Sequence, residues 1–147
     1  MADQTLVNLL KQGVATTWNA WRAQHYRQAV DLSGADLDYA NLGACNLART
    51  NLQGASLRSA DLNNANLQHA NLIDADFTGA NLARATLYAA DLTRAKLRDT
   101  NLSGANLSHA DLSEADLTKA DISETNLSET LVTPQQLKLA RSTRDFF

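Results

Sequence analysis

The sequence contains few of the residues that cross-link, stiffen or interrupt a folded chain. Its 147 residues include one cysteine, one proline and six glycines, and only 5% are aromatic. Because the single cysteine, Cys45, cannot form an intramolecular disulfide, a small disulfide-stabilised fold is excluded. We interpret Cys45 as a small buried residue and not as a redox group.

Long hydrophobic runs are also absent, although 44% of the residues are hydrophobic. No apolar segment approaches the roughly 20 residues that cross a bilayer as a helix. The first residues, Met1-Ala2-Asp3-Gln4, lack the basic and apolar regions of a secretory signal. The sequence therefore predicts a cytoplasmic protein of one domain that does not bind a membrane.

What the sequence does contain is a hydrophobic residue at every fifth position. From Leu32 to Leu127 this column holds eighteen leucines, with Phe77 and Ile122 as its other two members. Two residues before the column, alanine occupies fifteen of the twenty units. The residue between the two columns is Asp or Asn in seventeen of the twenty units, and the last two places of each unit vary.

A period of five fits neither an α-helix nor a long strand, so the chain must change direction once per unit. In an extended segment, residues two apart point to the same side, so the alanine and leucine columns face inward together. Each unit is then a very short strand followed by a turn, and the units bury their leucines only by stacking. The predicted core includes Leu32, Leu37, Leu42, Leu57, Phe77, Leu82, Leu97, Leu102, Leu117 and Ile122.

The charged residues predict how many units make one coil, because stacked neighbours avoid like charges. Between residues 31 and 129, a separation of twenty gives six opposite-charge pairs, such as Asp38 with Arg58, and one like pair. Separations of fifteen and twenty-five each give two opposite pairs, against four and five like pairs. Four units per coil are therefore favoured, and residues 30–129 are predicted to form an all-β solenoid of about five coils.

These units, of the form Ala-(Asp/Asn)-Leu-x-x, resemble those of the pentapeptide-repeat proteins. The stretch Trp18-Asn19-Ala20-Trp21-Arg22 before the first unit resembles the flank of cyanobacterial members of that family. The resemblance implies a right-handed quadrilateral β-helix. It also implies that some relatives protect bacterial gyrase by mimicking duplex DNA.

An open solenoid exposes its interior at both ends, and the flanking segments are predicted to cover it. Residues 1–29 form the expected N-terminal helical cap, with an apolar stripe and a break or bend at Gly13; the stripe consists of Leu6, Leu9, Leu10, Val14, Trp18 and Trp21. Residues 130–147 form the expected C-terminal cap and tail, in which a short helix starts at Thr133-Pro134. Phe146 and Phe147 either complete this cap or contact another chain, so a monomer and a weak homodimer both stay open.

The sequence offers no catalytic, cofactor-binding or metal-binding set. The three histidines are scattered at positions 25, 69 and 109, and His69 and His109 are predicted to lie two coils apart, too far for one metal ion. Neither a phosphate-binding loop nor a nucleophile motif is present. We therefore predict a protein that is not an enzyme and has no cofactor.

The favoured function is a rigid scaffold that binds an unknown protein partner through exposed residues that the fold does not require. The candidates are Tyr39, Ile73, Tyr88, Arg49, Arg58, Arg84 and Arg98. The alternative is a DNA mimic that binds gyrase or topoisomerase. Against it, the net charge is only −3, and strong acidity is confined to residues 111–129. Binding of nucleic acid is disfavoured because acids interrupt the basic residues.

Overall fold

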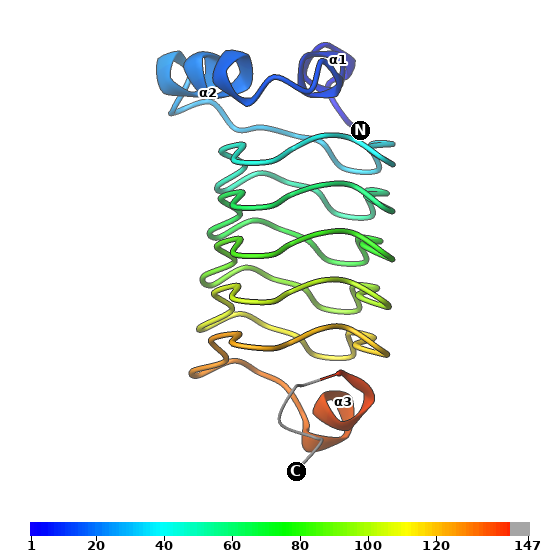
Figure 1. Cartoon of the computed structure of the whole chain (residues 1–147). Helices are drawn as coiled ribbons and strands as arrows, with labels where there is room; N and C mark the ends of the chain where they lie inside the picture. Colours follow the sequence, from blue (N-terminus) through cyan, green and yellow to red (C-terminus); the bar gives the residue numbers. More distant parts are fainter. Residues whose placement is uncertain (142–147) are drawn as a thin grey trace.

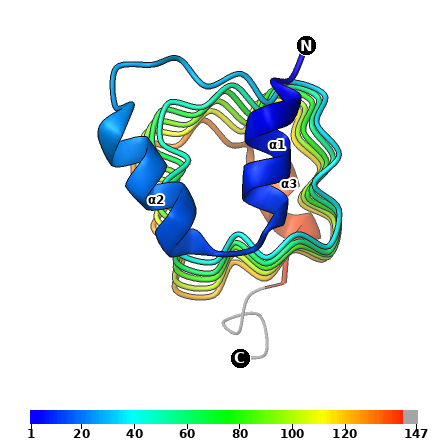
Figure 2. The same cartoon turned by 90° about the horizontal axis from the view of Figure 1, so that it is seen from above.

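A computed structural model describes residues 1–141 (Figure 1). Two helices precede the repeats, α1 (Gln4–Lys11) and α2 (Ala15–Gln24), and one helix follows them, α3 (Pro134–Leu139). Between α2 and α3 the chain winds into stacked turns, with α1 and α2 over one end of the stack and α3 at the other (Figure 1). Viewed along the stack, the turns superpose on one four-sided outline (Figure 2).

Neighbouring turns are joined by isolated parallel bridges. Each bridge found in residues 31–141 joins residues twenty apart, beginning with Asp31 and Asn51. In that first bridge, the Leu32 amide donates to the Asn51 carbonyl at 2.7 Å, and the Asn51 amide donates to the Val30 carbonyl at 2.9 Å. Twenty is the separation that the charge pattern favours. The bridges continue past residue 129, because Leu131 pairs with Asp111 and Arg141 with Asp121.

Each corner is a tight turn with an unusual backbone angle. In the first unit the Ala35 amide donates to the Leu32 carbonyl at 3.0 Å, which closes a four-residue turn. The third residue of this turn, Gly34, has φ of +67°, as a type II turn requires. The last place of all twenty units has positive φ, and sixteen of those residues are not glycine. The repeat therefore imposes a left-handed backbone conformation even on residues with large side chains, such as Tyr39.

The interior is filled by the leucine column. All the predicted core residues from Leu32 to Leu102 have 0% exposure, and Leu117 has 1%. Ile122 differs, since it is only partly buried. It lies in the last full turn, where the hydrophobic column ends at Leu127, and Leu127 is partly buried as well. Beyond this turn, α3 lies under only part of the outline (Figure 2).

The lone cysteine also lies in the interior. Cys45 is 2% exposed, and burial raises the pKa of its thiol to about 11. The thiol is therefore protonated at neutral pH, which makes it a poor nucleophile and a poor metal ligand.

At the N-terminal end, α1 and α2 lie over the first turn. The Asp3 side chain caps α1, and Gly13, with φ of +69°, lies between the two helices. The Trp18 indole is 1% exposed, and its Nε1 donates to the Asn46 carbonyl at 2.8 Å. One member of the predicted apolar stripe differs, because Val14 precedes α2 and is 48% exposed.

At the other end, α3 begins with a capping box formed by Thr133 and Gln136. The Gln136 amide also donates to the carbonyls of Leu112 and Ala115, at 2.6 and 2.9 Å, and so ties α3 to the last turns. Leu137 packs against the core, whereas Leu139 is 55% exposed. The predicted contacts of Phe146 and Phe147 lie outside the described residues.

Candidate interaction surface

The Asp and Asn side chains of the repeat accept hydrogen bonds from backbone amides of the turns. In the first unit, Asp31 Oδ1 accepts from the Ser33 amide at 2.9 Å, and most units repeat this bond. These oxygens therefore satisfy turn amides and do not converge on a ligand. Consistently, residues 1–141 contain no group of three His, Cys, Asp or Glu side chains that could hold a metal ion.

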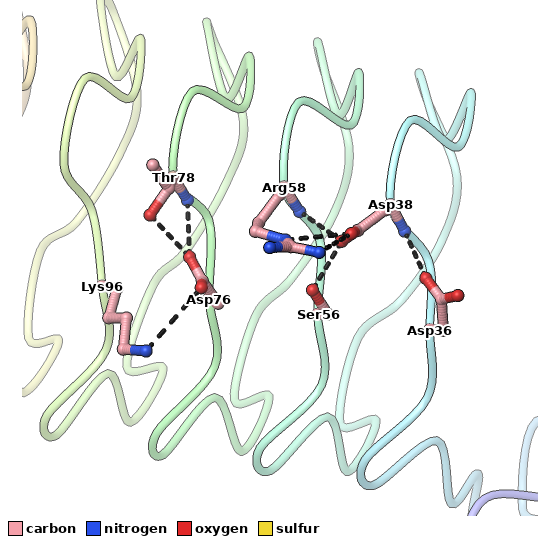
Figure 3. Close-up of polar contacts among 7 residues, drawn as sticks. All are labelled: Asp36, Asp38, Ser56, Arg58, Asp76, Thr78 and Lys96. Atoms are coloured by element: carbon pink, nitrogen blue, oxygen red, sulfur yellow. Dashed lines mark hydrogen bonds and ion pairs between the residues drawn. The ribbon is translucent and has the colours of Figure 1, made fainter.

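One face carries a ladder of charged side chains that is drawn in Figure 3. Arg58 donates from Nε and Nη2 to Asp38 Oδ2, at 2.9 and 2.5 Å. Asp38 Oδ1 accepts from the Ser56 hydroxyl at 2.5 Å and from the Arg58 amide at 3.0 Å. Position 56 is one of the three in the polar column without Asp or Asn. Asp38 of the neighbouring turn therefore accepts the bond from the Arg58 amide that residue 56 would otherwise accept.

The charge on this face is neutralised pair by pair. The Arg58 guanidinium, together with Ser56 and the Arg58 amide, lowers the pKa of Asp38 to about 2. Two turns along, Lys96 Nζ lies 3.8 Å from Asp76 Oδ2 (Figure 3). On the next face, Arg94 forms a bidentate ion pair with Asp74, in which Nε donates to Oδ1 and Nη2 to Oδ2, both at 2.8 Å. Alternating pairs of this kind leave no continuous track of one charge along the stack.

The structure does not bring the seven predicted surface residues together. By register, Tyr39, Arg58 and Arg98 lie on one face, Arg49 and Tyr88 on a second, and Ile73 and Arg84 each on another. Tyr39 is 80% exposed and stands without an aromatic neighbour in the described residues, while Ile73 is half-buried. Arg58 is engaged with Asp38, and Arg98 Nε lies 3.8 Å from Asp99 Oδ2.

The structure assembles an aromatic cluster that was not predicted from the sequence. The Tyr88 ring lies between His69 and His109, with ring centroids 5.5 and 5.3 Å apart and edge-to-face angles of 88° and 70°. His109 Nδ1 in turn lies 3.2 Å from Glu129 Oε2. We call His69, Tyr88 and His109 the aromatic edge.

The signal for the aromatic edge was present in the sequence. A strict separation of twenty places Ala89, and not an aromatic residue, between the two histidines. Tyr88 is instead nineteen residues after His69 and twenty-one before His109. Diagonal neighbours of this kind also lie within reach of aromatic side chains.

None of the helices within residues 1–141 is long and apolar enough to cross a lipid bilayer.

The sequence matches the family model "Pentapeptide repeats" in eight copies, over residues 28–64, 60–99 and 95–132. Comparison with curated protein sequences found no significant match.

Several solved structures are similar to this chain. A pentapeptide repeat protein from the thylakoid lumen of Arabidopsis thaliana is 30% identical, with 76% of this chain and 77% of that chain covered and a TM-score of 0.53. The pentapeptide repeat protein alr5209 from Nostoc PCC 7120 is 28% identical, with 97% and 96% covered and a TM-score of 0.47. QnrB1, a plasmid-mediated fluoroquinolone resistance protein, is 18% identical, with 82% and 68% covered and a TM-score of 0.40.

Proteins built from these repeats form right-handed quadrilateral β-helices and serve in general as structural or interaction modules. The family model spans residues 28–132, which is most of the chain, and its units coincide with the stacked turns of the structure. The resemblance inferred from the Ala-(Asp/Asn)-Leu-x-x units is thereby confirmed, and the chain belongs to the pentapeptide repeat family.

Proposed function

We propose that this protein is a non-enzymatic, rigid scaffold that binds a protein partner through its aromatic edge. The observation that carries the proposal is the position of Tyr88 between His69 and His109, three rings in one row on the side of the stack. Tyr and His side chains combine an apolar body with a polar tip, and tyrosine is enriched at the centre of protein interfaces.

The backbone that carries the rings is held in place before any partner arrives. Each ring stands on a turn whose backbone is bonded to the turns above and below, as in the bond from the His69 amide to the Tyr88 carbonyl at 3.0 Å. Little backbone freedom remains to be lost when a partner binds. Such preorganisation raises affinity without requiring a large interface.

The two ends of the stack favour the side as the interaction surface. We infer that residues 30–129 make about five coils, with α1 and α2 as one cap and α3 as the other. Asn19 of α2 supports the capping of the first coil, since its side chain donates to the Ala44 carbonyl at 3.0 Å and accepts from the Asn46 amide at 2.7 Å. Caps of this kind block edge-to-edge association, which favours a monomer or a weak homodimer.

Affinity capture from the source organism, with the full chain as bait, tests the proposal. We expect a partner that is retained by the wild type and by Tyr39→Ala but reduced at least tenfold by Tyr88→Ala. Tyr39→Ala is the matched control, because Tyr39 is also an exposed tyrosine but lies on another face. Equal retention by both variants, with unchanged circular dichroism, would exclude the aromatic edge as the binding site.

Mimicry of DNA toward gyrase or topoisomerase is the second proposal for this chain. The ion pairs Asp38 with Arg58 and Asp74 with Arg94 count against it, because they interrupt the negative charge that a mimic of the phosphate backbone needs. A location in the cytoplasm also stays a prediction.

A further inference from the structure

A second surface lies at the junction of α2 with the first turn of the repeat. A hollow of about 450 Å³ opens there, and its lining contains three arginines and no acid: Arg22, Tyr26, Arg27, Gln28, Ala29 and Arg49. The arginines come from two distant stretches of chain, since Arg22 lies in the last turn of α2, Arg27 in the connection after it, and Arg49 in the first turn of the repeat.

The pairing of the arginines distinguishes this hollow from the rest of the surface. Among the eight arginines of residues 1–141, Arg58, Arg94, Arg98 and Arg141 each lie within 4.0 Å of an aspartate. The other four have no such acid within the described part of the chain, and three of these four line the hollow.

Arg22 is the most constrained of the three. It is 8% exposed, and its guanidinium donates to backbone carbonyls, among them Gln28 from Nη1 at 3.3 Å and Ala48 from Nη2 at 3.2 Å. Its Nε is buried without a hydrogen-bond partner in residues 1–141, and burial lowers the pKa of the side chain. The end of α2 and these carbonyls supply partial negative charge but no counter-ion, and a buried charge without a counter-ion is costly.

We propose that this hollow binds the phosphate group of a small molecule. Planar guanidinium groups match the oxygens of a phosphate, and Arg27 and Arg49 are the two that we expect to contact it. Arg22, whose Nη atoms already donate to backbone carbonyls, adds a third positive charge behind them. Tyr26 and Gln28 add a hydroxyl and an amide as further donors, and the Arg27 guanidinium already lies 5.4 Å from the Tyr26 ring centroid. The volume falls in the range of small-ligand sites and leaves room for more than a free phosphate ion.

Titration calorimetry on the full chain at low ionic strength tests this proposal. The probes are inorganic phosphate and the monoester phosphoserine, with acetate as a monoanionic comparison. We expect saturable 1:1 binding of a phosphate probe in the millimolar range or tighter, and at least tenfold weaker binding of acetate. A phosphoserine affinity at least tenfold above that of inorganic phosphate would identify a monoester as the ligand, whereas equal affinities would identify the free ion.

Variants locate the site. Arg27→Gln and Arg49→Gln are each expected to weaken phosphate binding about tenfold, which corresponds to the loss of one charge-assisted contact. Arg84→Gln is the matched control, since Arg84 is the fourth arginine without an acid neighbour in residues 1–141 and lies on another face. Absence of saturable binding, acetate binding as tight as phosphate, or an equal loss in Arg84→Gln would each overturn the proposal.

Discussion

At the scale of single residues, the repeat requires the same left-handed backbone conformation at the last place of every unit, and most of the residues found there disfavour this conformation. The last place of each unit has positive φ, yet only four of the twenty residues there are glycine. An L-residue in this conformation costs roughly 1 kcal/mol relative to glycine, a cost partly offset by its lower freedom in the unfolded chain. The repeat tolerates this cost because the neighbouring turns fix the backbone on both sides.

Two substitutions test this account of the corner residue. Gly54 has φ of +65° and open space where a Cβ would lie, so Gly54→Ala should destabilise the protein by about 1 kcal/mol through backbone strain alone. Ala44 has φ of +58° and is exposed, so Ala44→Gly should be stabilising by up to about 1 kcal/mol. The measurement is the free energy of unfolding in urea. Gly43→Ala is the control, because Gly43 lies one place earlier without positive φ and should change little.

The threonines of the alanine column differ from one another in a testable way. The Thr100 hydroxyl donates to the Phe77 carbonyl at 2.8 Å, whereas the Thr50 hydroxyl is buried without a hydrogen-bond partner in residues 1–141. Thr100→Val should cost about 1 kcal/mol, because it removes a buried hydrogen bond and leaves the Phe77 carbonyl with only the bond from the Ala80 amide, at 2.9 Å. Thr50→Val should be neutral or stabilising, because it removes an unsatisfied polar group at nearly constant volume. Equal losses in the two variants, measured by thermal unfolding, would contradict this difference.

At the scale of turns and helices, contacts that repeat with the period of the coil could be predicted from the sequence, whereas contacts between the helices and the turns could not. The leucine column and the charge pairs are periodic, so Leu82 in the interior and Asp38 opposite Arg58 follow from the sequence with no other information. The arginine hollow is different, because it depends on how α2 lies across the first turn, and no period in the sequence encodes that angle. The partial exposure of Ile122 is likewise a feature of the end of the stack, and the hydrophobic period does not distinguish this residue from the buried members of its column.

The Asp38–Arg58 pair predicts how stability responds to acid. The folded-state pKa of Asp38 is about 2, below the value of roughly 3.9 for an unfolded aspartate. Its contribution is therefore fully present above about pH 4 and is lost as the pH falls through 2. Because Arg58 is 59% exposed and solvent screens the pair, we expect a contribution on the order of 1 kcal/mol.

Urea unfolding at pH 6 and at pH 2.5 measures this contribution. Asp38→Asn should be less stable than the wild type at pH 6, and the difference should shrink at pH 2.5. Ser56→Ala keeps the ion pair and removes only one donor to Asp38, so it should retain most of the pH dependence. A difference between wild type and Asp38→Asn that is the same at both pH values would show that the pair does not control acid stability.

At the scale of the whole molecule, charge is distributed unevenly along the stack. Residues 111–129 hold six acids against Lys119, a net charge of −5, while residues 71–110 are neutral with four acids and four bases. The acids of the middle turns are also paired, as in Asp74 with Arg94 and Asp76 with Lys96. A partner that recognises duplex DNA would therefore meet strong negative charge at one end of the stack only.

This distribution predicts that the protein does not inhibit DNA supercoiling by gyrase at micromolar concentration. The opposing possibility is that loss of α3 exposes the acidic turn and lets two copies extend it into a longer negative surface. That arrangement would place −5 against −5, and the repulsion would oppose association unless an apolar contact offset it. A supercoiling assay with the full chain and with a chain that lacks the last fourteen residues separates the two cases. We expect neither form to inhibit, and potent inhibition by either one would make mimicry of DNA the leading proposal for this protein.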